Sequence, residues 1–292
     1  MKILGVKRAT EYSPNHTEND SQIFHLTMQH LEEKGYEVDL ISEEKFLTST
    51  TTPNAIFAMA RNQSTVAKLQ QLEQEGITVI NSGYAIESCY RANLTQICLE
   101  KGVSYPFSKC IDTTVDFFDE VNNFPHNSFW IKRGDVHAIH KEDVVQVFSK
   151  AEGKNVLREF ALRGIKTAVI QEHIHGDIIK FYAVRKSDFF HWFYLLDTNH
   201  TKFGIEQNSN TNNHTEFSEE KLRAVAEKAA NALNLDIYGG DIIVKPDGSL
   251  WLIDLNDWPS FAPVREQASL AIANLIHQRI GGQRHIHLIN TK

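Results

Sequence analysis

The first 88 residues alternate between short apolar runs and longer amphipathic stretches. Apolar runs predict strands at residues 2–7, 36–42, 55–60 and 77–81. Between them, apolar residues recur at helical spacing, as in Phe24, Met28 and Leu31, and the two stretches end at Gly35 and Gly76. Strand and helix therefore alternate, which predicts a small parallel sheet covered by helices.

The rhythm changes after residue 88. A helix is expected at 90–102, and Pro106 begins a new segment. Two apolar strands, "SFWIKRG" and "TAVIQEHI", flank a region that we expect to be helical from Glu142 to Arg163. The runs "IIKFYAV" and "DFFHWFYLL" then predict an antiparallel pair that turns at residues 186–188. This part of the chain reads as α+β.

Composition and charge narrow the classes of function. The 292 residues are 41% hydrophobic and carry a net charge of −7, with the basic residues dispersed along the chain. A nucleic-acid binder would need a massed basic face, so we expect no nucleic-acid partner. No apolar run is long enough for a membrane span, and the start of the chain turns charged too early for a signal peptide. We expect a cytoplasmic protein with no membrane partner and with three reduced cysteines.

A predicted hairpin near the C-terminus brings acidic residues together. Asp247-Gly248 lies between two apolar runs, "YGGDIIV" and "LWLIDL", and predicts a two-residue turn because Asp and Gly tolerate positive φ. With that turn, cross-strand partners have numbers that sum to 495. Asp241 is then directly opposite Asp254, and Asn256 shares the face of Asp254.

Two opposed carboxylates among apolar neighbours repel each other unless a cation lies between them. Oxygen ligands from two acids and one amide suit Mg²⁺, whose remaining positions phosphate oxygens and water fill. The alternative is a surface hairpin with solvated acids, but both strands are too apolar for that. Asp257 points to the other face and is left out of the predicted metal set.

Two lysines lie in apolar strands, Lys132 in "FWIKRGD" and Lys180 in "GDIIKFYAV". A buried ammonium needs an anion, although snorkelling at a strand end is an alternative for each lysine alone. Between them, "VIQEHIHGD" is an apolar strand that runs into a glycine turn. Such a hinge can read an adenine edge with its backbone while a carboxylate takes the ribose hydroxyls.

In order along the chain, these elements resemble the ATP-grasp superfamily. The resemblance rests on "NSGYAIESCYRANLTQICLEKGVSYPFS", "WIKRG", "VIQEHIHGDIIKFYAV", "YGGDIIV" and "IDLNDWPSF". It implies a fold of α/β and α+β type: a Rossmann-like pre-ATP-grasp domain at 1–88, a central ATP-grasp subdomain at 89–174, and a C-terminal subdomain with the metal site at 175–292.

The resemblance also implies a site for ATP between the two ATP-grasp subdomains. Lys132 and Lys180 would contact phosphates, and Arg91 would do so from the entry helix, unless it is a solvated helix arginine. The implied adenine hinge consists of Gln171, Glu172, His173 and Ile174. The implied ligands of Mg²⁺, with Mn²⁺ as an alternative, are Asp241, Asp254 and Asn256.

One departure from the family concerns the segment after Lys132. Most ligases of the superfamily have a glycine-rich loop there, whereas this chain reads "KRGDVHAIHKEDV". His137 and His140 are candidates to screen the γ-phosphate in its place, and surface histidines are the alternative reading.

Two enzymatic functions follow from the resemblance. The favoured one is a carboxylate–amine ligase, similar to glutathione synthetase or ribosomal-protein glutamate ligases, which activates a carboxylate as an acyl phosphate. Lys180 and Arg265 would then be catalytic, with Ser260 facing the acceptor and Lys7 and Arg8 binding a substrate carboxylate.

The alternative is a kinase similar to inositol polyphosphate 5/6-kinases, which share the "KFYAV"-type strand and lack the glycine-rich cradle. A non-catalytic nucleotide-binding module is a third reading. We expect a small-molecule or peptide substrate, and a homodimer is left open.

Overall fold

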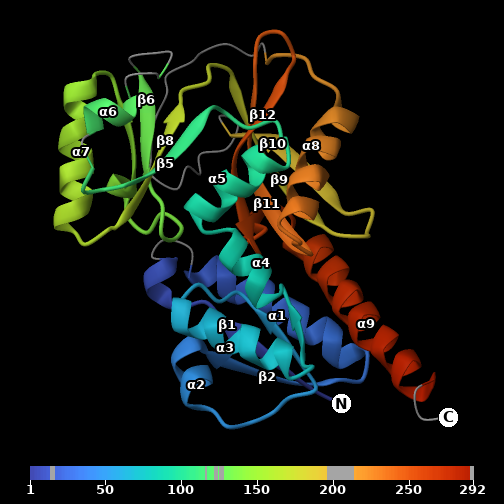
Figure 1. The fold of residues 1–292 in the computed structure, drawn as a ribbon. Coiled ribbons are helices and arrows are strands. Elements are labelled where there is room, and N and C mark those ends of the chain that lie inside the picture. Colours follow the sequence, from blue (N-terminus) through green and yellow to red (C-terminus); the bar gives the residue numbers. More distant parts are fainter. Residues whose placement is uncertain (14–16, 116, 122–123, 125–127, 196–213, 290–292) are drawn as a thin grey trace.

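The fold contains three four-stranded sheets, which Figure 1 shows as an N-terminal unit joined to two further units. The structure is a computed structural model that describes residues 1–13, 17–115, 117–121, 124, 128–195 and 214–289. Within those residues, no helix is long and apolar enough to cross a membrane. The alternation of element types expected from the sequence is confirmed.

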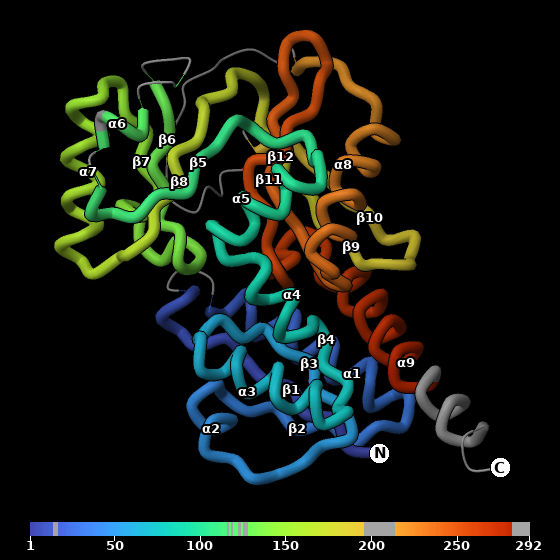
Figure 2. The backbone as a smooth tube through the Cα atoms, in the orientation of Figure 1, coloured from blue at the N-terminus to red at the C-terminus, as the bar shows by residue number. Residues whose placement is uncertain are grey.

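The N-terminal unit is a parallel sheet in the order β2-β1-β3-β4. Its elements are β1 (Lys2–Lys7), α1 (Thr17–Glu33), β2 (Glu37–Ser42), α2 (Glu43–Thr48), β3 (Ala55–Ala58), α3 (Gln63–Gln74), β4 (Thr78–Ile80) and α4 (Gly83–Ser88). Helices lie on both faces (Figure 2), so all four residues of β3 are buried. The carboxyl ends of the parallel strands share one edge, which points toward the other two units.

The central unit is an antiparallel sheet in the order β5-β8-β6-β7. After α5 (Arg91–Glu100) come β5 (Ser108–Asp112), α6 (Phe117–Val121), β6 (Phe129–Arg133), β7 (Val144–Val147), α7 (Lys150–Leu162) and β8 (Thr167–Glu172). The helix expected from residue 142 to 163 is therefore wrong in its first part. The sequence Val-Val-Gln-Val suits a strand, and it pairs with the free edge of β6. The helix begins only after Ser149, whose hydroxyl caps it.

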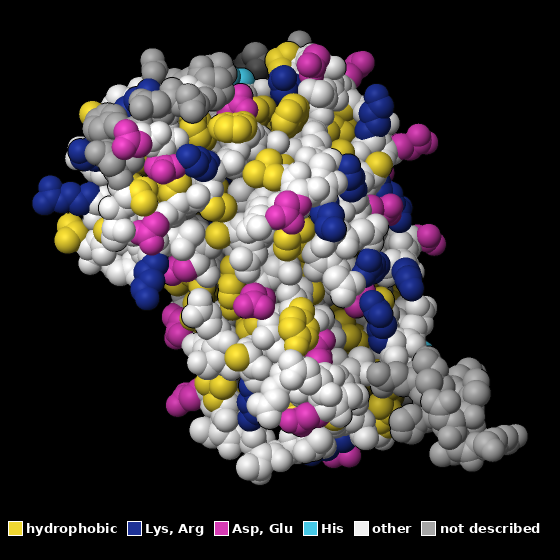
Figure 3. Space-filling view, in the orientation of Figure 1, with side chains coloured by type: hydrophobic (Ala, Val, Ile, Leu, Met, Phe, Trp, Pro, Cys, Tyr) yellow, Lys and Arg dark blue, Asp and Glu magenta, His cyan; other side chains and the backbone are white. Residues whose placement is uncertain are grey.

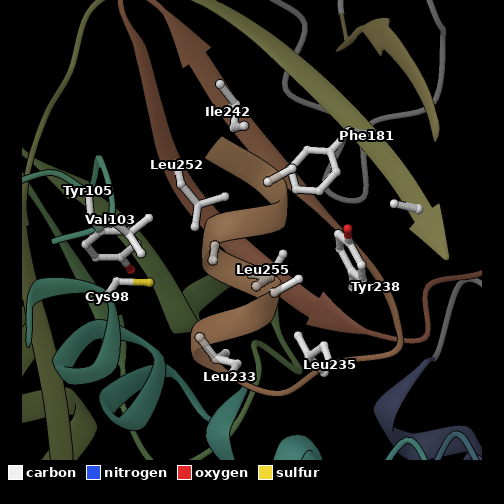
Figure 4. Packing of buried hydrophobic residues seen from close by; sticks show 14 of the residues in the cluster. Cys98, Val103, Tyr105, Phe181, Leu233, Leu235, Tyr238, Ile242, Leu252 and Leu255 are labelled. Atoms are coloured by element: carbon white, nitrogen blue, oxygen red, sulfur yellow. The ribbon is translucent and has the colours of Figure 1, made fainter. Parts of the chain in front are cut away.

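The C-terminal unit is an antiparallel sheet in the order β10-β9-β11-β12. Its elements are β9 (Asp177–Val184), β10 (Phe190–Tyr194), α8 (Glu219–Ala232), β11 (Ile237–Val244), β12 (Leu250–Asp257) and α9 (Arg265–Ile289). One face packs against α8 in a core that includes Phe181, Leu233, Tyr238, Leu252 and Leu255 (Figure 4). Cys98 of α5 joins the same core, so α5 is fixed against this unit.

The hairpin between β11 and β12 differs from the expected one. The backbone N–H of Gly248 donates to Lys245 (2.8 Å), and that of Lys245 donates to Ser249 (2.9 Å). The loop therefore has three residues, with Gly248 at φ 75°, and the two-residue turn was wrong. Near the turn, partners sum to 494, as in Val244 and Leu250. A bulge after Asp241 restores the sum of 495, and the opposition of Asp241 and Asp254 is confirmed.

The N-terminal unit is fastened to the ends of β11 and β12. The side chain of Asn81 accepts from the backbone N–H groups of Asp236 and Ile237 (2.9 Å each) and donates to the carbonyl of Ile237 (2.7 Å). Trp258 is fully buried, with its ring centroid 5.4 Å from that of Phe24 and 5.8 Å from that of Phe57. Both contacts hold the end of β12 close to the carboxyl edge of the parallel sheet.

Candidate active site

A row of charged side chains crosses three strands of the C-terminal sheet. Asp241 on β11 pairs with Lys180 on β9 and with Asp254 on β12. The Nζ atom of Lys180 lies 2.8 Å from Oδ1 of Asp241. Directly opposed residues of a sheet point to the same face, so register alone brings one cation and two acids together.

Arginine from another element meets this row. Arg91 is the first residue of α5, and its Nη1 lies 3.4 Å from Oδ1 of Asp254. The Arg91 side chain is only 5% exposed, and its Nε has no hydrogen-bond partner within the described residues. The row thus holds two ion pairs, Lys180 with Asp241 and Arg91 with Asp254.

Close backbone approach shapes the row. A Cβ atom at Gly240 would lie 2.3 Å from the carbonyl oxygen of Asp254, and one at Gly239 would lie 2.7 Å from that of Phe181. Only glycine allows β11 to lie this close to both neighbours. The two glycines of "YGGD" therefore set the spacing on which the opposition of Asp241 and Asp254 depends.

Lys132 of β6 approaches from the central sheet. Its Nζ donates to Oε1 of Gln171 (2.6 Å) and to the carbonyl of Ile253 (3.4 Å), and Gln171 in turn donates to the hydroxyl of Ser108 (3.1 Å). Burial and then the neighbouring Arg91 lower the pKa of Lys132 to about 7. A lysine held by neutral oxygens in a buried position is ready to gain a proton when an anion arrives.

Asp254 is ionised, because nearby cations outweigh the effect of burial. Burial by itself would raise the pKa of Asp254, but Arg91, Lys132 and His137 outweigh it and lower that pKa well below the usual range. The same balance acts on Lys180, whose pKa Asp241 raises despite burial. Asp254 therefore carries its charge at neutral pH, and Lys180 is protonated.

The donor set fits a divalent cation. Oδ1 of Asp241 is buried and accepts no hydrogen bond of good geometry, although Lys180 lies beside it. Nδ2 of Asn256 donates to Oδ2 of Asp254 (3.4 Å), which leaves the amide oxygen of Asn256 available. Among the described residues no three His, Cys, Asp or Glu side chains form a cluster. Two carboxylates and an amide are a set that Mg²⁺ accepts when phosphate and water complete its shell.

The predicted adenine hinge joins the central and C-terminal sheets. β8 ends at Glu172 and β9 begins at Asp177. The backbone N–H of Glu172 donates to Phe107 (2.8 Å), and Nε1 of Trp130 donates to Nδ1 of His173 (3.0 Å). Ile174 is buried. Gln171, the first residue of this segment, bonds to Lys132, and its role as an adenine hinge stays a prediction.

The two candidate histidines occupy different environments. His137 is 4% exposed, and its Nε2 donates to Oδ1 of Asp257 (3.1 Å). Burial and then Arg61 lower its pKa to about 4, so this histidine is neutral. His140 is exposed, and its backbone N–H donates to Asp143. Within the part of the chain that the structure describes, neither histidine hydrogen-bonds to Asp241 or Asp254.

The remaining candidates lie at the edge of the N-terminal sheet or near the start of α9. Arg8 follows β1 and donates to Asp20 (3.0 Å) and to the carbonyl of Trp258 (2.9 Å), while Lys7 is half-buried at the end of β1. Arg265 begins α9 and bonds to Asn19, and its Nε is buried without a partner among the described residues. Ser260 is half-buried between β12 and α9. The structure therefore places these four candidates between the N-terminal unit and the end of β12.

Sequence reasoning missed Arg61, which lies near this edge. It follows β3 just as Arg8 follows β1, and its Nη2 lies 3.6 Å from Oδ1 of Asp257. The shared carboxyl edge of neighbouring parallel strands was a signal that would have found it. Asp257 is not among the metal ligands predicted from the sequence. In the structure it is the buried partner of both Arg61 and His137.

No protein-family model and no curated protein sequence matches the chain. Solved structures do match over nearly its whole length. The D-alanine-D-alanine ligase of Coxiella burnetii has a TM-score of 0.71 at 12% identity and covers 100% of both chains. The D-alanine–D-alanine ligase of Bacillus anthracis complexed with ATP has a TM-score of 0.66 at 14% identity over 98% of this chain and 99% of that one. A RimK domain ATP-grasp protein of Sphaerobacter thermophilus has a TM-score of 0.66 at 13% identity over 94% and 98%.

Proposed function

We propose that this chain, which has the ATP-grasp fold, is an ATP- and Mg²⁺-dependent ligase that joins a carboxylate to an amine. The observation that carries the proposal is the row of Lys180, Asp241 and Asp254, which faces Arg91 and Lys132. Three basic and two acidic side chains in one half-buried place suit a triphosphate with its metal.

Each cation has a distinct part in binding the nucleotide. Lys132 and Arg91 would exchange their present partners, Gln171 and Asp254, for phosphate oxygens. The hinge from Gln171 to Ile174 would hold the adenine. Lys180 would contact the transferred phosphoryl group, since it extends from β9 beside Asp241. We place the domain boundaries after residues 88 and 174, so the nucleotide would lie between the second and third domains.

Asp241, Asp254 and Asn256 would hold Mg²⁺, or Mn²⁺ in its place. When bound, the metal would neutralise charge on the phosphates. The chain contributes orientation: Arg91 keeps the Asp254 carboxylate ionised, Lys180 pairs with Asp241, and the bulge after Asp241 keeps the two acids opposed.

The proposed reaction has two displacements. An oxygen of the acceptor carboxylate attacks the γ-phosphorus, the bond to the β-γ bridging oxygen breaks, and ADP leaves. The amine then attacks the acyl carbon, the carbon–oxygen bond to phosphate breaks, and inorganic phosphate leaves as the nitrogen loses a proton. The acceptor would enter from the side of the N-terminal unit, where Arg8 bonds to Trp258 and Arg265 bonds to Asn19, and Lys7 and Ser260 would help to bind it. The loop that carries His137 and His140 would cover the phosphates.

Three observations support a ligase over a kinase of crowded polyanions. The named activities of the matched structures are ligations in two of the three cases described. The chain is acidic overall, with a net charge of −7. Arg8 is already bonded to Asp20, which leaves few cations for a second polyanion. A small-molecule or peptide acceptor fits these limits.

Product analysis tests the proposal. The protein is incubated with ATP, MgCl₂ and pooled amino acids, dipeptides or inositol phosphates. We expect ADP and inorganic phosphate in equal amounts together with a new amide; ADP with a phosphorylated acceptor and no free phosphate would support the kinase instead. Asp254→Asn should lower ADP formation about a hundredfold or more, while the exposed control Asp39→Asn should not. Unchanged turnover in Asp254→Asn would refute the metal assignment.

A further inference from the structure

A cavity of about 470 Å³ lies away from the charged row. It is bounded by the turn between β9 and β10, by the second half of α8, and by Arg279 of α9. Its volume is within the range that small-molecule sites in proteins occupy. Nothing in the ligase reaction uses it.

The cavity lies on the opposite face of the C-terminal sheet. Ala183 and Tyr238 line it, and each is an odd number of residues from the charged row, three from Lys180 and three from Asp241. Side chains alternate between the faces of a strand, so the cavity and the row are separated by the sheet itself. A ligand in the cavity would therefore not be a substrate of the row.

The walls of the cavity are rich in hydrogen-bond donors. Arg185 donates to the side-chain oxygens of Asn231 (2.6 Å) and Asn234 (2.9 Å). Both amides therefore turn their oxygen toward the guanidinium, which leaves their NH₂ groups as donors. Tyr238 also lines the cavity.

Two further cations complete one side of the cavity. Arg223 donates through Nε to Glu227 (2.8 Å) and through Nη2 to the carbonyl of Ser187 (3.2 Å), which leaves Nη1 without a partner. Lys186 lies in the turn at φ 56° and forms no ion pair among the described residues. The guanidinium of Arg223 also lies over the ring of Phe190, 5.6 Å from its centroid, so an apolar surface adjoins the donors.

The charges favour an anion. Arg185, Lys186, Arg223 and Arg279 line the cavity, against Glu227 in the lining. Arg279 is bonded to Asp236 behind the wall (2.7 Å), and Asp188 lies in the same turn as Lys186. Figure 3 shows Lys and Arg side chains along the right of the view, with Asp and Glu side chains between them, where Figure 1 places α8. Basic side chains therefore outnumber acidic ones in the lining itself, four to one.

We propose that this cavity binds a small organic anion, whose carboxylate or phosphate oxygens accept from Lys186, Arg223 and the amides of Asn231 and Asn234, and whose apolar part lies on Phe190. The donors come from the β9–β10 turn and α8, so an occupant would join the two elements. The proposal does not depend on the ligase assignment.

Calorimetric titration and thermal shift of the full chain test the site, with citrate, inorganic phosphate and a nucleoside monophosphate as probes. We expect saturable binding of at least one probe; citrate alone would indicate a carboxylate ligand, and the phosphates alone a phosphate ligand. Arg223→Gln and Lys186→Asn should each weaken that binding about tenfold, and asparagine tolerates the left-handed backbone of position 186.

Two control variants separate the cavity from other sites. Lys221→Gln removes an exposed lysine of α8 that does not line the cavity, and it should leave the affinity unchanged. Lys132→Gln, which alters the lysine that faces the charged row from the central sheet, should also leave it unchanged. The proposal is overturned if no probe binds saturably, or if binding survives Arg223→Gln and Lys186→Asn but is lost in Lys132→Gln.

Discussion

Nε2 of His137 donates to Oδ1 of Asp257 across 3.1 Å, and Nη2 of Arg61 lies 3.6 Å from the same oxygen. The three residues come from the central unit, the end of β12 and the edge of the N-terminal sheet, and each is at most 6% exposed. One carboxylate therefore joins all three units. Arg61 and then His137 lower the pKa of Asp257 to about 2, against the effect of burial.

Asp257→Asn should destabilise the protein strongly. Removing the charge leaves the guanidinium of Arg61 buried without its carboxylate, which typically costs about 3–5 kcal/mol. The measurement is the free energy of unfolding in urea. The control Asp39→Asn breaks an exposed pair with Lys2 and should cost less than about 1 kcal/mol. Equal free energies of unfolding for the two variants would show that the Asp257 carboxylate stabilises the protein no more than an exposed ion pair does.

The free energy of unfolding should decrease as the pH is lowered, and part of this decrease should come from His137. Its pKa is about 4 in the folded protein and 6.5 ordinarily. Below pH 6.5 the unfolded chain gains a proton that the folded chain does not, so falling pH favours unfolding through this residue until about pH 4. His137→Gln removes the titration. We expect its deficit in unfolding free energy at pH 7.5 to shrink by about 2 kcal/mol at pH 5; a constant deficit would contradict the lowered pKa.

Nucleotide binding should take up a proton at Lys132. With a pKa of about 7, this lysine is mostly neutral at pH 8 in the free protein, and a phosphate beside it would raise the pKa. Calorimetry with a non-hydrolysable ATP analogue, in two buffers of different ionisation enthalpy, should show an uptake of ~1 proton at pH 8 and much less at pH 6. Lys132→Arg stays charged and should abolish the difference. Identical proton counts for the two proteins would place the phosphates elsewhere.

Gly240→Ala should damage the charged row. Its Cβ would lie 2.3 Å from the carbonyl oxygen of Asp254, so β12 must shift, at a cost of about 1–3 kcal/mol, and ADP formation should fall with it. Gly281→Ala is the matched control, because nothing lies within 4 Å of its Cβ; in a helix this change should stabilise by up to about 1 kcal/mol. Full activity in Gly240→Ala would mean that the spacing of β11 and β12 is not critical.

The opposition of Asp241 and Asp254 was predicted from the sequence by a turn that the structure does not contain. The three-residue loop shifts every pair near it by one, and the bulge after Asp241 shifts the register back. The prediction held because an acid facing the apolar side of the hairpin would be costly, and register follows the buried face. No local signal in "LWLIDL" indicates where the extra residue is accommodated.

The sequence by itself determined the alternation of strands and helices, the parallel N-terminal sheet and the acidic pair, because these follow from periodicity and from pairing between near neighbours. The expectation of an ATP-grasp fold rested instead on the resemblance of several motifs to that superfamily. Only the tertiary structure decided that residues 144–147 extend β6 as a strand, since a free sheet edge outweighed the expected helix. It also decided that Arg61, His137 and Asp257 meet. Contacts between residues so far apart in the sequence depend on how the three units pack. A single side chain contributes no periodic sequence pattern from which such packing could be predicted.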